Sequence, residues 1–137
     1  MREGKQWVFY VSRSARGIGD AEVQEIVRIS QARNLEKGLT GMLLFTGAHF
    51  AQVLEGDPAQ LDPLVGAILA DPRHSDVRVL GREPLTRRRY LQWSLRLVTQ
   101  LGRADLIEDL LDTPTVPIER ARRLITELFR FPPDRRR

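Results

Sequence analysis

The chain has 137 residues, 42% of them hydrophobic, and a formal net charge of +4, so we expect a single compact unit with a modest core. It contains no cysteine, which excludes a disulfide framework, a thiol nucleophile and a thiolate metal site. No apolar run approaches the ~20 residues that cross a bilayer. Because no signal-peptide core follows Met1, we expect a cytoplasmic protein without a membrane anchor.

The excess positive charge lies largely in two arginine runs, at 87–89 and at 135–137. We interpret both as solvated arginines, the second of them in a frayed tail. DNA binding through these arginines is the minor alternative.

The first half of the chain predicts strand, helix, strand and strand. Residues 6–12 have strand composition. After a glycine-containing stretch, a helix follows with Asp20 as its N-cap and ends near Asn34, before Gly38. Residues 38–56 predict two strands joined by a three-residue turn that contains a glycine. Both faces of this hairpin are largely apolar, so it belongs in the middle of a covered sheet.

The second half predicts a helix, two strands and two short helices. Their expected ranges are 58–71, 77–85, 90–98, 103–111 and 117–129. The order is that of a ferredoxin-like α+β sandwich, βαββαββ, with one added strand. We expect the first two helices on one sheet face and the C-terminal helices on the other. Residues 1–100 form the expected domain, and residues 101–137 form a helical extension packed on the sheet.

One polar side chain falls in the centre of the predicted sheet. Gln52 shares a face with Phe50 and Leu54 in a strand that should be buried, where an amide without partners costs about 1–3 kcal/mol. Either a neighbouring core group satisfies this amide, or the amide faces a ligand. An amide carries both donors and an acceptor, so it can contact a ring edge with both kinds of atom and can respond by turning over.

Six segments, taken together, resemble a known family. They are YVS at 10–12, SQARN at 30–34, GLTGMLL at 38–44, FAQVLEG at 50–56, DPRH at 71–74 and WS at 93–94. In this order and spacing the chain is similar to the BLUF domains, which are blue-light sensors that hold a flavin between the two helices covering one sheet face. The resemblance implies FAD as the cofactor, with FMN or riboflavin as alternatives.

The resemblance also implies roles for single residues. The family places a tyrosine and a glutamine next to the flavin C4 carbonyl and N5, and an asparagine at the carbonyl edge, which match Tyr10, Gln52 and Asn34. Light would drive an electron and a proton from Tyr10 to the flavin, Gln52 would rearrange its hydrogen bonds by rotation or tautomerisation, and the spectrum would shift to the red. The other residues implied at the flavin are Ile26 and Ile68 on either side of the ring, with Ser30, Leu54, Asp71, Arg73 and His74 in or near the pocket.

The resemblance implies that two positions in the expected last strand, Trp93 and Leu95, relay the signal. The family usually carries a methionine where this chain has Leu95, which conserves volume but lacks the polarizable sulfur. The orientation of Trp93 is left open by the sequence.

The residues alone also support plainer interpretations of these positions. Ile26 and Ile68 fit the apolar stripes of their helices, and Arg73 and His74 fit a solvated helix end. His49 and His74 are the only histidines and neither has ligand spacing, so we expect no metal site.

We therefore expect a photoreceptor that signals to an unidentified downstream protein and is not an enzyme, because a cycle that returns to its start transforms no substrate. Apolar positions in the C-terminal helices favour a homodimer or higher oligomer, or else packing of the same residues on the sheet. The rival hypotheses are a flavin-free ferredoxin-like binding module that binds nucleic acid through its arginines, and a small enzyme of the same fold. For the enzyme, the sequence offers no convincing nucleophile–base pair or paired carboxylates.

Overall fold

The structure, a computed structural model, describes residues 4–130 of the chain. Its five strands are β1 (Gln6–Ser14), β2 (Thr40–Phe45), β3 (His49–Gly56), β4 (His74–Pro84) and β5 (Arg96–Thr99). They form one sheet in the order β4-β1-β3-β2-β5, in which β5 runs parallel to β2 and the other neighbours are antiparallel. This is the predicted ferredoxin-like arrangement, with the added strand beside β2.

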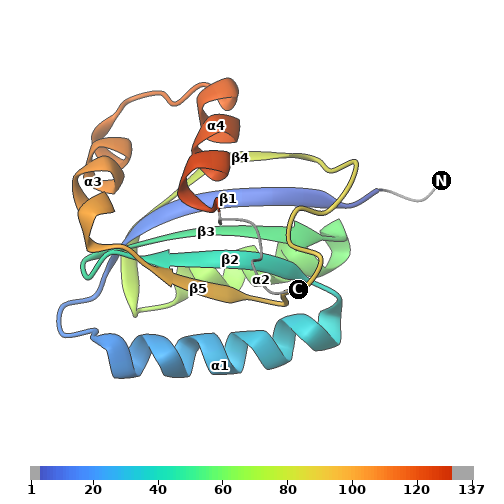
Figure 1. The fold of residues 1–137 in the computed structure, drawn as a ribbon, viewed down its shortest axis with the longest axis horizontal. Coiled ribbons are helices and arrows are strands. Elements are labelled where there is room, and N and C mark those ends of the chain that lie inside the picture. The colour runs from blue at the N-terminus through green and yellow to red at the C-terminus, as the bar shows by residue number, and fades with distance from the viewer. Residues whose placement is uncertain (1–3, 131–137) are drawn as a thin grey trace, which may run out of the picture.

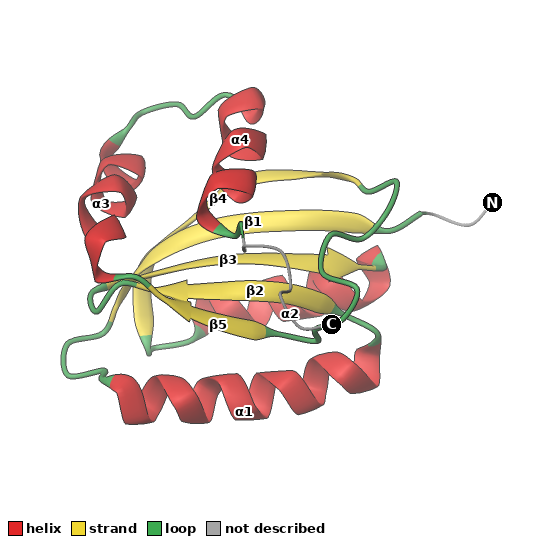
Figure 2. Ribbon diagram, in the orientation of Figure 1, coloured by secondary structure: helices red, strands yellow, loops and turns green. Residues whose placement is uncertain are grey.

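Helices cover both faces of the sheet (Figures 1 and 2). The helices α1 (Asp20–Lys37) and α2 (Pro58–Ala70) lie on one face. The helices α3 (Ala104–Asp112) and α4 (Ile118–Leu128) lie on the other face. A short 3-10 helix, η1 (Leu101–Arg103), precedes α3. The predicted distribution of helices over the two faces is therefore confirmed. No helix within residues 4–130 has the length and apolar character needed to cross a membrane.

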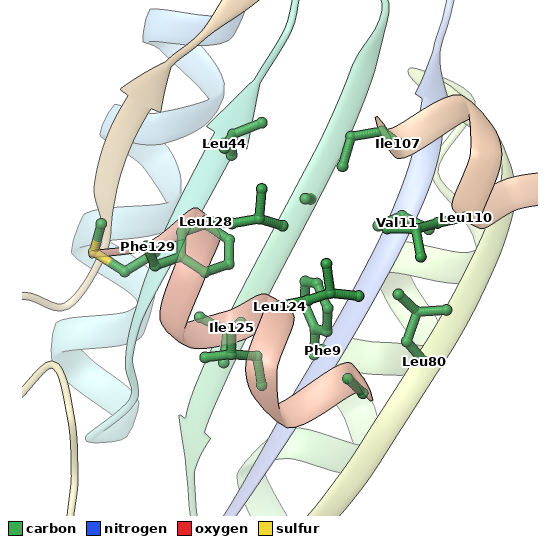
Figure 3. Packing of buried hydrophobic residues seen from close by; sticks show 14 of the residues in the cluster. Phe9, Val11, Leu44, Leu80, Ile107, Leu110, Leu124, Ile125, Leu128 and Phe129 are labelled. Carbon is green, nitrogen blue, oxygen red and sulfur yellow. The ribbon is translucent and has the colours of Figure 1, made fainter. Parts of the chain in front are cut away.

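Strand alternation divides the core into two layers. Figure 3 shows the layer beneath the C-terminal helices, where side chains of β1 and β2 contact those of α3 and α4: Phe9, Val11, Leu44, Ile107, Leu124, Ile125 and Leu128. Burial of each such side chain contributes about 1.5–3 kcal/mol, so α3 and α4 are part of the hydrophobic core. Because these apolar residues pack on the sheet, they no longer argue for an oligomer.

The predicted strand over residues 90–98 is wrong in its first six residues, because only Arg96–Thr99 pairs with β2. In a strand the odd-numbered residues would share one face. Instead Leu91 is 74% exposed, Trp93 packs in the core layer under α4, and Leu95 packs on the opposite side with α1.

The boundaries of α1 also differ from the prediction. Its N-cap is Gly19 and not Asp20, because the Gly19 N–H donates to Glu22 Oε1 at 2.9 Å. The helix continues three residues beyond Asn34 and, as predicted, ends before Gly38, whose left-handed φ of 69° glycine adopts without strain. The arginines expected to fray at 135–137 lie outside the described residues.

Candidate functional site

A cleft lies between α1 and α2 on one face of the sheet. It contains about 520 Å³ that protein atoms do not fill, part of it open to solvent. Its lining comes from both helices, from the central strands and from the segments after α2 and before β5: Tyr10, Ile26, Ser30, Arg33, Leu43, Phe50, Gln52, Ile68, Asp71, Arg73, His74 and Leu95.

Tyr10 and Gln52 meet at the sheet side of this cleft. They are register partners on the antiparallel strands β1 and β3, so their side chains project from the same face. Gln52 Nε2 donates to Tyr10 Oη at 2.5 Å, and both residues are buried. Within residues 4–130, Gln52 Oε1 accepts no hydrogen bond and the Tyr10 hydroxyl donates none. The pair therefore leaves one acceptor and one donor for a ligand in the cleft.

The protonation of Tyr10 follows from its surroundings. Burial raises the pKa of Tyr10 above its usual value and outweighs the opposing effect of the Gln52 hydrogen bond. The phenol is therefore neutral at neutral pH. Turning the Gln52 amide over would let Tyr10 donate to Oε1 and would direct the amide N–H groups elsewhere.

His74 is held by protein groups on both ring nitrogens. Nε2 lies 2.5 Å from the carbonyl oxygen of Ile68, and Nδ1 lies 2.8 Å from Ser12 Oγ. A carbonyl can only accept, so Nε2 carries a proton, and in the neutral ring Nδ1 accepts from Ser12. The ring packs edge-on against Tyr10 and Phe50, with centroids 6.0 and 6.2 Å apart. His74 therefore fixes the end of α2 next to Tyr10.

Two arginines bring positive charge to the cleft. Arg33 Nε is buried and has no hydrogen-bond partner among the residues that the structure describes. Burial lowers the pKa of Arg33 below its usual value, and the Arg73 cation adds to this effect. Arg73 Nε donates to Asp71 Oδ1 at 3.0 Å, and this interaction lowers the pKa of Asp71. An unmet buried donor is costly, so Arg33 favours a ligand that carries acceptors.

The segment before β5 is tied to α1 by two side-chain amides. Asn34 Nδ2 donates to the Ser94 carbonyl at 2.9 Å, and Gln31 Nε2 donates to the Leu95 carbonyl at 3.0 Å. These bonds hold the backbone of the segment, so that the Leu95 side chain enters the cleft. Trp93 points away from the cleft and packs in the core layer under α4.

A buried carboxylate holds the preceding loop. Glu55 of β3 is fully buried, and its Oε2 accepts from the backbone N–H of Arg89 at 2.8 Å. Its Oε1 accepts from the backbone N–H of Tyr90 at 3.2 Å and from Thr40 Oγ1 at 2.8 Å. Glu55 therefore fixes the loop that leads to Trp93.

Most residues proposed from the sequence line this one cleft: Tyr10, Ile26, Ser30, Gln52, Ile68, Asp71, Arg73, His74 and Leu95. Two do not. Leu54 is enclosed by Val8, Leu39, Leu61 and Leu64 in the core, and the Asn34 amide is engaged by Ser94.

Sequence reasoning missed three lining residues, Arg33, Leu43 and Phe50. The alternation of β2 and β3 could have identified Leu43 and Phe50, because both face the same side as Gln52. Arg33 follows Ser30 by one helical turn, a spacing that places both near the same face. Within the described part of the chain, no group of three potential metal-ligating side chains is present.

The family model BLUF, described as sensors of blue-light using FAD, matches residues 6–96, more than half of the chain. The chain belongs to the BLUF family. Its cofactor is accordingly a flavin, FAD by the family's description. The residues present fit such a group, since the cleft offers an acceptor and a donor at Gln52 and Tyr10 and an unmet donor at Arg33.

Solved BLUF structures resemble the whole described fold. The dark-state structure of the BLUF protein BlrB has a TM-score of 0.76 and 34% identity, and the match covers 93% of this chain and 97% of that one. BlrP1 of Klebsiella pneumoniae, solved with FMN and cyclic diGMP, has a TM-score of 0.70 and 31% identity, over 90% of this chain and 34% of that one.

A curated relative is much longer. The photoactivated adenylate cyclase subunit beta of Euglena gracilis is 40% identical over 72 residues, 53% of this chain. The match spans only 8% of the length of that protein.

Proposed function

We propose that the chain is a blue-light photoreceptor in which FAD lies in the α1–α2 cleft and light changes the hydrogen bonds of Tyr10 and Gln52. The observation that carries this proposal is the 2.5 Å hydrogen bond between these two residues, at the sheet side of a cleft lined by both helices. Family membership supports the blue-light and flavin parts of the proposal.

Several lining residues are suited to hold the cofactor. Ile26 and Ile68 enter the cleft from α1 and α2, so we assign them to the two faces of the flat ring. Arg33 offers its unpartnered Nε–H, whereas the charge of Arg73 is paired with Asp71 of the same cleft. A bound flavin supplies an excited state, reached on absorbing blue light, that accepts one electron and one proton.

Tyr10 is the donor of that electron and of the proton on Oη. The raised pKa of Tyr10 keeps the proton on the phenol in the dark. A phenol that loses an electron becomes a strong acid and therefore releases this proton. Gln52 then no longer has the neutral Tyr10 phenol as its hydrogen-bond partner, so its amide turns over or tautomerises. Return of the electron and the proton to Tyr10 would re-form the neutral phenol, and reversal of the Gln52 amide in the dark would then restore the starting state, so no substrate is transformed.

A short series of contacts connects Gln52 with the opposite face of the sheet. Leu95 lines the same cleft as Gln52, and the backbone of its segment is tied to α1 by Gln31 and Asn34. Trp93, two residues earlier, packs under α4. We infer that a shift of this segment carries the signal to a partner protein. The Euglena relative, named as a photoactivated cyclase, supports a signalling role.

The absorption spectrum of the purified chain, loaded with FAD and recorded before and after blue light, tests the proposal. We expect a yellow protein whose flavin band shifts to the red and returns in the dark. A colourless protein that does not take up FAD, FMN or riboflavin would instead favour the flavin-free binding module.

A further inference from the structure

A second groove lies on the other side of the sheet, between the loop before β5 and α4. Arg89 of the loop and Arg122, Arg123 and Arg130 of the α4 region line it. The Arg89 Nη1 donates to Thr126 Oγ1 at 3.0 Å, which joins the loop to the helix. The adjoining part of the groove reaches Trp93. Four guanidinium groups therefore share one concave surface.

Carboxylates compensate only part of the positive charge at this groove, since Arg122 pairs with Glu83. Glu127, the one acidic residue among the described residues of its lining, already pairs with Arg103 at 3.0 Å. Arg123 and Arg130 are exposed and form no ion pair with any residue in the range 4–130. Such a surface attracts a ligand of negative charge.

The aromatic residues of the groove distinguish between two kinds of anionic ligand. A groove for single-stranded nucleic acid presents open ring faces on which bases stack. Here Tyr90 and Phe129 are only 6% and 4% exposed, and the Arg96 guanidinium lies 4.7 Å above the Trp93 ring. These residues offer no open ring face on which a base could stack, so the groove fits a polypeptide better than single-stranded nucleic acid.

The end of the chain does not complement this surface. Residues 131–137 contain one aspartate and three arginines, so their net charge has the same sign as the groove. The complementary ligand is therefore an acidic segment of another protein.

We propose that this groove binds an acidic segment of a partner protein, with carboxylates at Arg123 and Arg130 and an apolar side chain beside Trp93. The role of the groove as the output surface of a photosensor rests on the proposed function. The link between the two sites is short, because Trp93 of the groove is two residues from Leu95 of the flavin cleft. As a binding surface for acidic peptide, the groove does not depend on light.

Fluorescence anisotropy with the full chain tests this proposal. The probe is a fluorescein-labelled peptide in which pairs of glutamates alternate with single leucines, and labelled oligothymidylate is the comparison ligand. Arg123→Glu and Arg130→Glu are the groove variants. Arg16→Glu, in the exposed loop between β1 and α1, makes the same charge change outside the groove.

We expect each groove variant to weaken peptide binding about tenfold, whereas Arg16→Glu weakens it less than about twofold. Equal weakening by all three variants, tighter binding of oligothymidylate than of the peptide, or no peptide binding would overturn the proposal. An absorption spectrum of each sample separates the two claims. A chain that shifts to the red but binds no peptide contradicts only the groove, and one that binds peptide but does not shift contradicts only the photoreceptor.

Discussion

Gln52 donates a hydrogen bond to Tyr10 across the central strands β1 and β3, at a distance of 2.5 Å. Because the two residues are register partners, the strand ladder fixes their separation and leaves the amide torsion as the part that can change. The free Oε1 of Gln52 and the Tyr10 hydroxyl proton are then the groups available to the flavin.

Replacement of Gln52 tests the role of the amide. Gln52→Leu keeps a side chain of similar size but removes the donor and the acceptor, so we expect FAD binding to persist and the light-induced red shift to be lost. The measurement is the absorption spectrum before and after blue light. Gln24→Leu, on the exposed side of α1, is the control and should shift normally. A red shift of full size in Gln52→Leu would show that the amide is not the switch.

Arg33 is the lining residue with an unmet donor, so its loss should weaken cofactor binding. We expect Arg33→Met to bind FAD about tenfold more weakly, which corresponds to about 1.4 kcal/mol. Fluorescence titration of the flavin-free chain with FAD measures this. Arg28→Met, on the same helix but exposed and paired with Glu25, should bind FAD normally. Equal affinities of the two variants would contradict our assignment of Arg33.

Glu55 should be a strong determinant of stability. Glu55→Leu leaves the backbone N–H groups of Arg89 and Tyr90 without their acceptor, so we expect a loss of about 3 kcal/mol in the free energy of unfolding. Denaturant unfolding measures this free energy, with Glu36→Leu, at an exposed position of α1, as the control. A loss below about 0.5 kcal/mol would mean that water replaces the carboxylate.

A charged cluster ties α3 to the end of β1 and β3. Arg13 and His49, register partners three residues along from Tyr10 and Gln52, both bind Glu108. Hydrogen bonds from Arg13, and after it from His49, lower the pKa of Glu108 from 4.5 to about 2.

A carboxyl group whose pKa is lower in the folded state stabilises the fold above its unfolded pKa and loses this effect as pH falls. We therefore expect Glu108→Gln to lower the melting temperature at pH 7, and the difference from the parent to disappear as pH falls from 4.5 to about 2. Thermal unfolding across this pH range measures it. Asp105→Asn, exposed on the same helix, is the control. A difference that does not change with pH would show that the Glu108 charge is not responsible.

The hairpin and the core of the site were predictable from the sequence. Alternating apolar residues and a glycine turn define β2 and β3, and the polarity of Gln52 on an apolar face indicated a ligand or a buried partner. The structure shows a buried partner, since Gln52 binds Tyr10, and it also places Gln52 in the lining of the cleft.

The loop at residues 90–95 was not predictable in the same way. Its residues alternate like a strand, but the Glu55 carboxylate binds the N–H of Tyr90, and Asn34 binds the Ser94 carbonyl. These backbone groups are satisfied by side chains distant in sequence, and no local pattern encodes that. The orientation of Trp93 under α4 follows from the same contacts.

The most direct test of the account is the light-minus-dark absorption spectrum of the FAD-loaded Tyr10→Phe variant. The chain has two tyrosines, and Tyr90→Phe is the matched control because Tyr90 is also buried but lies on the α4 side of the sheet. We predict a normal red shift in the parent and in Tyr90→Phe, and no shift in Tyr10→Phe although it binds FAD. A red shift of normal size in Tyr10→Phe would contradict the central claim.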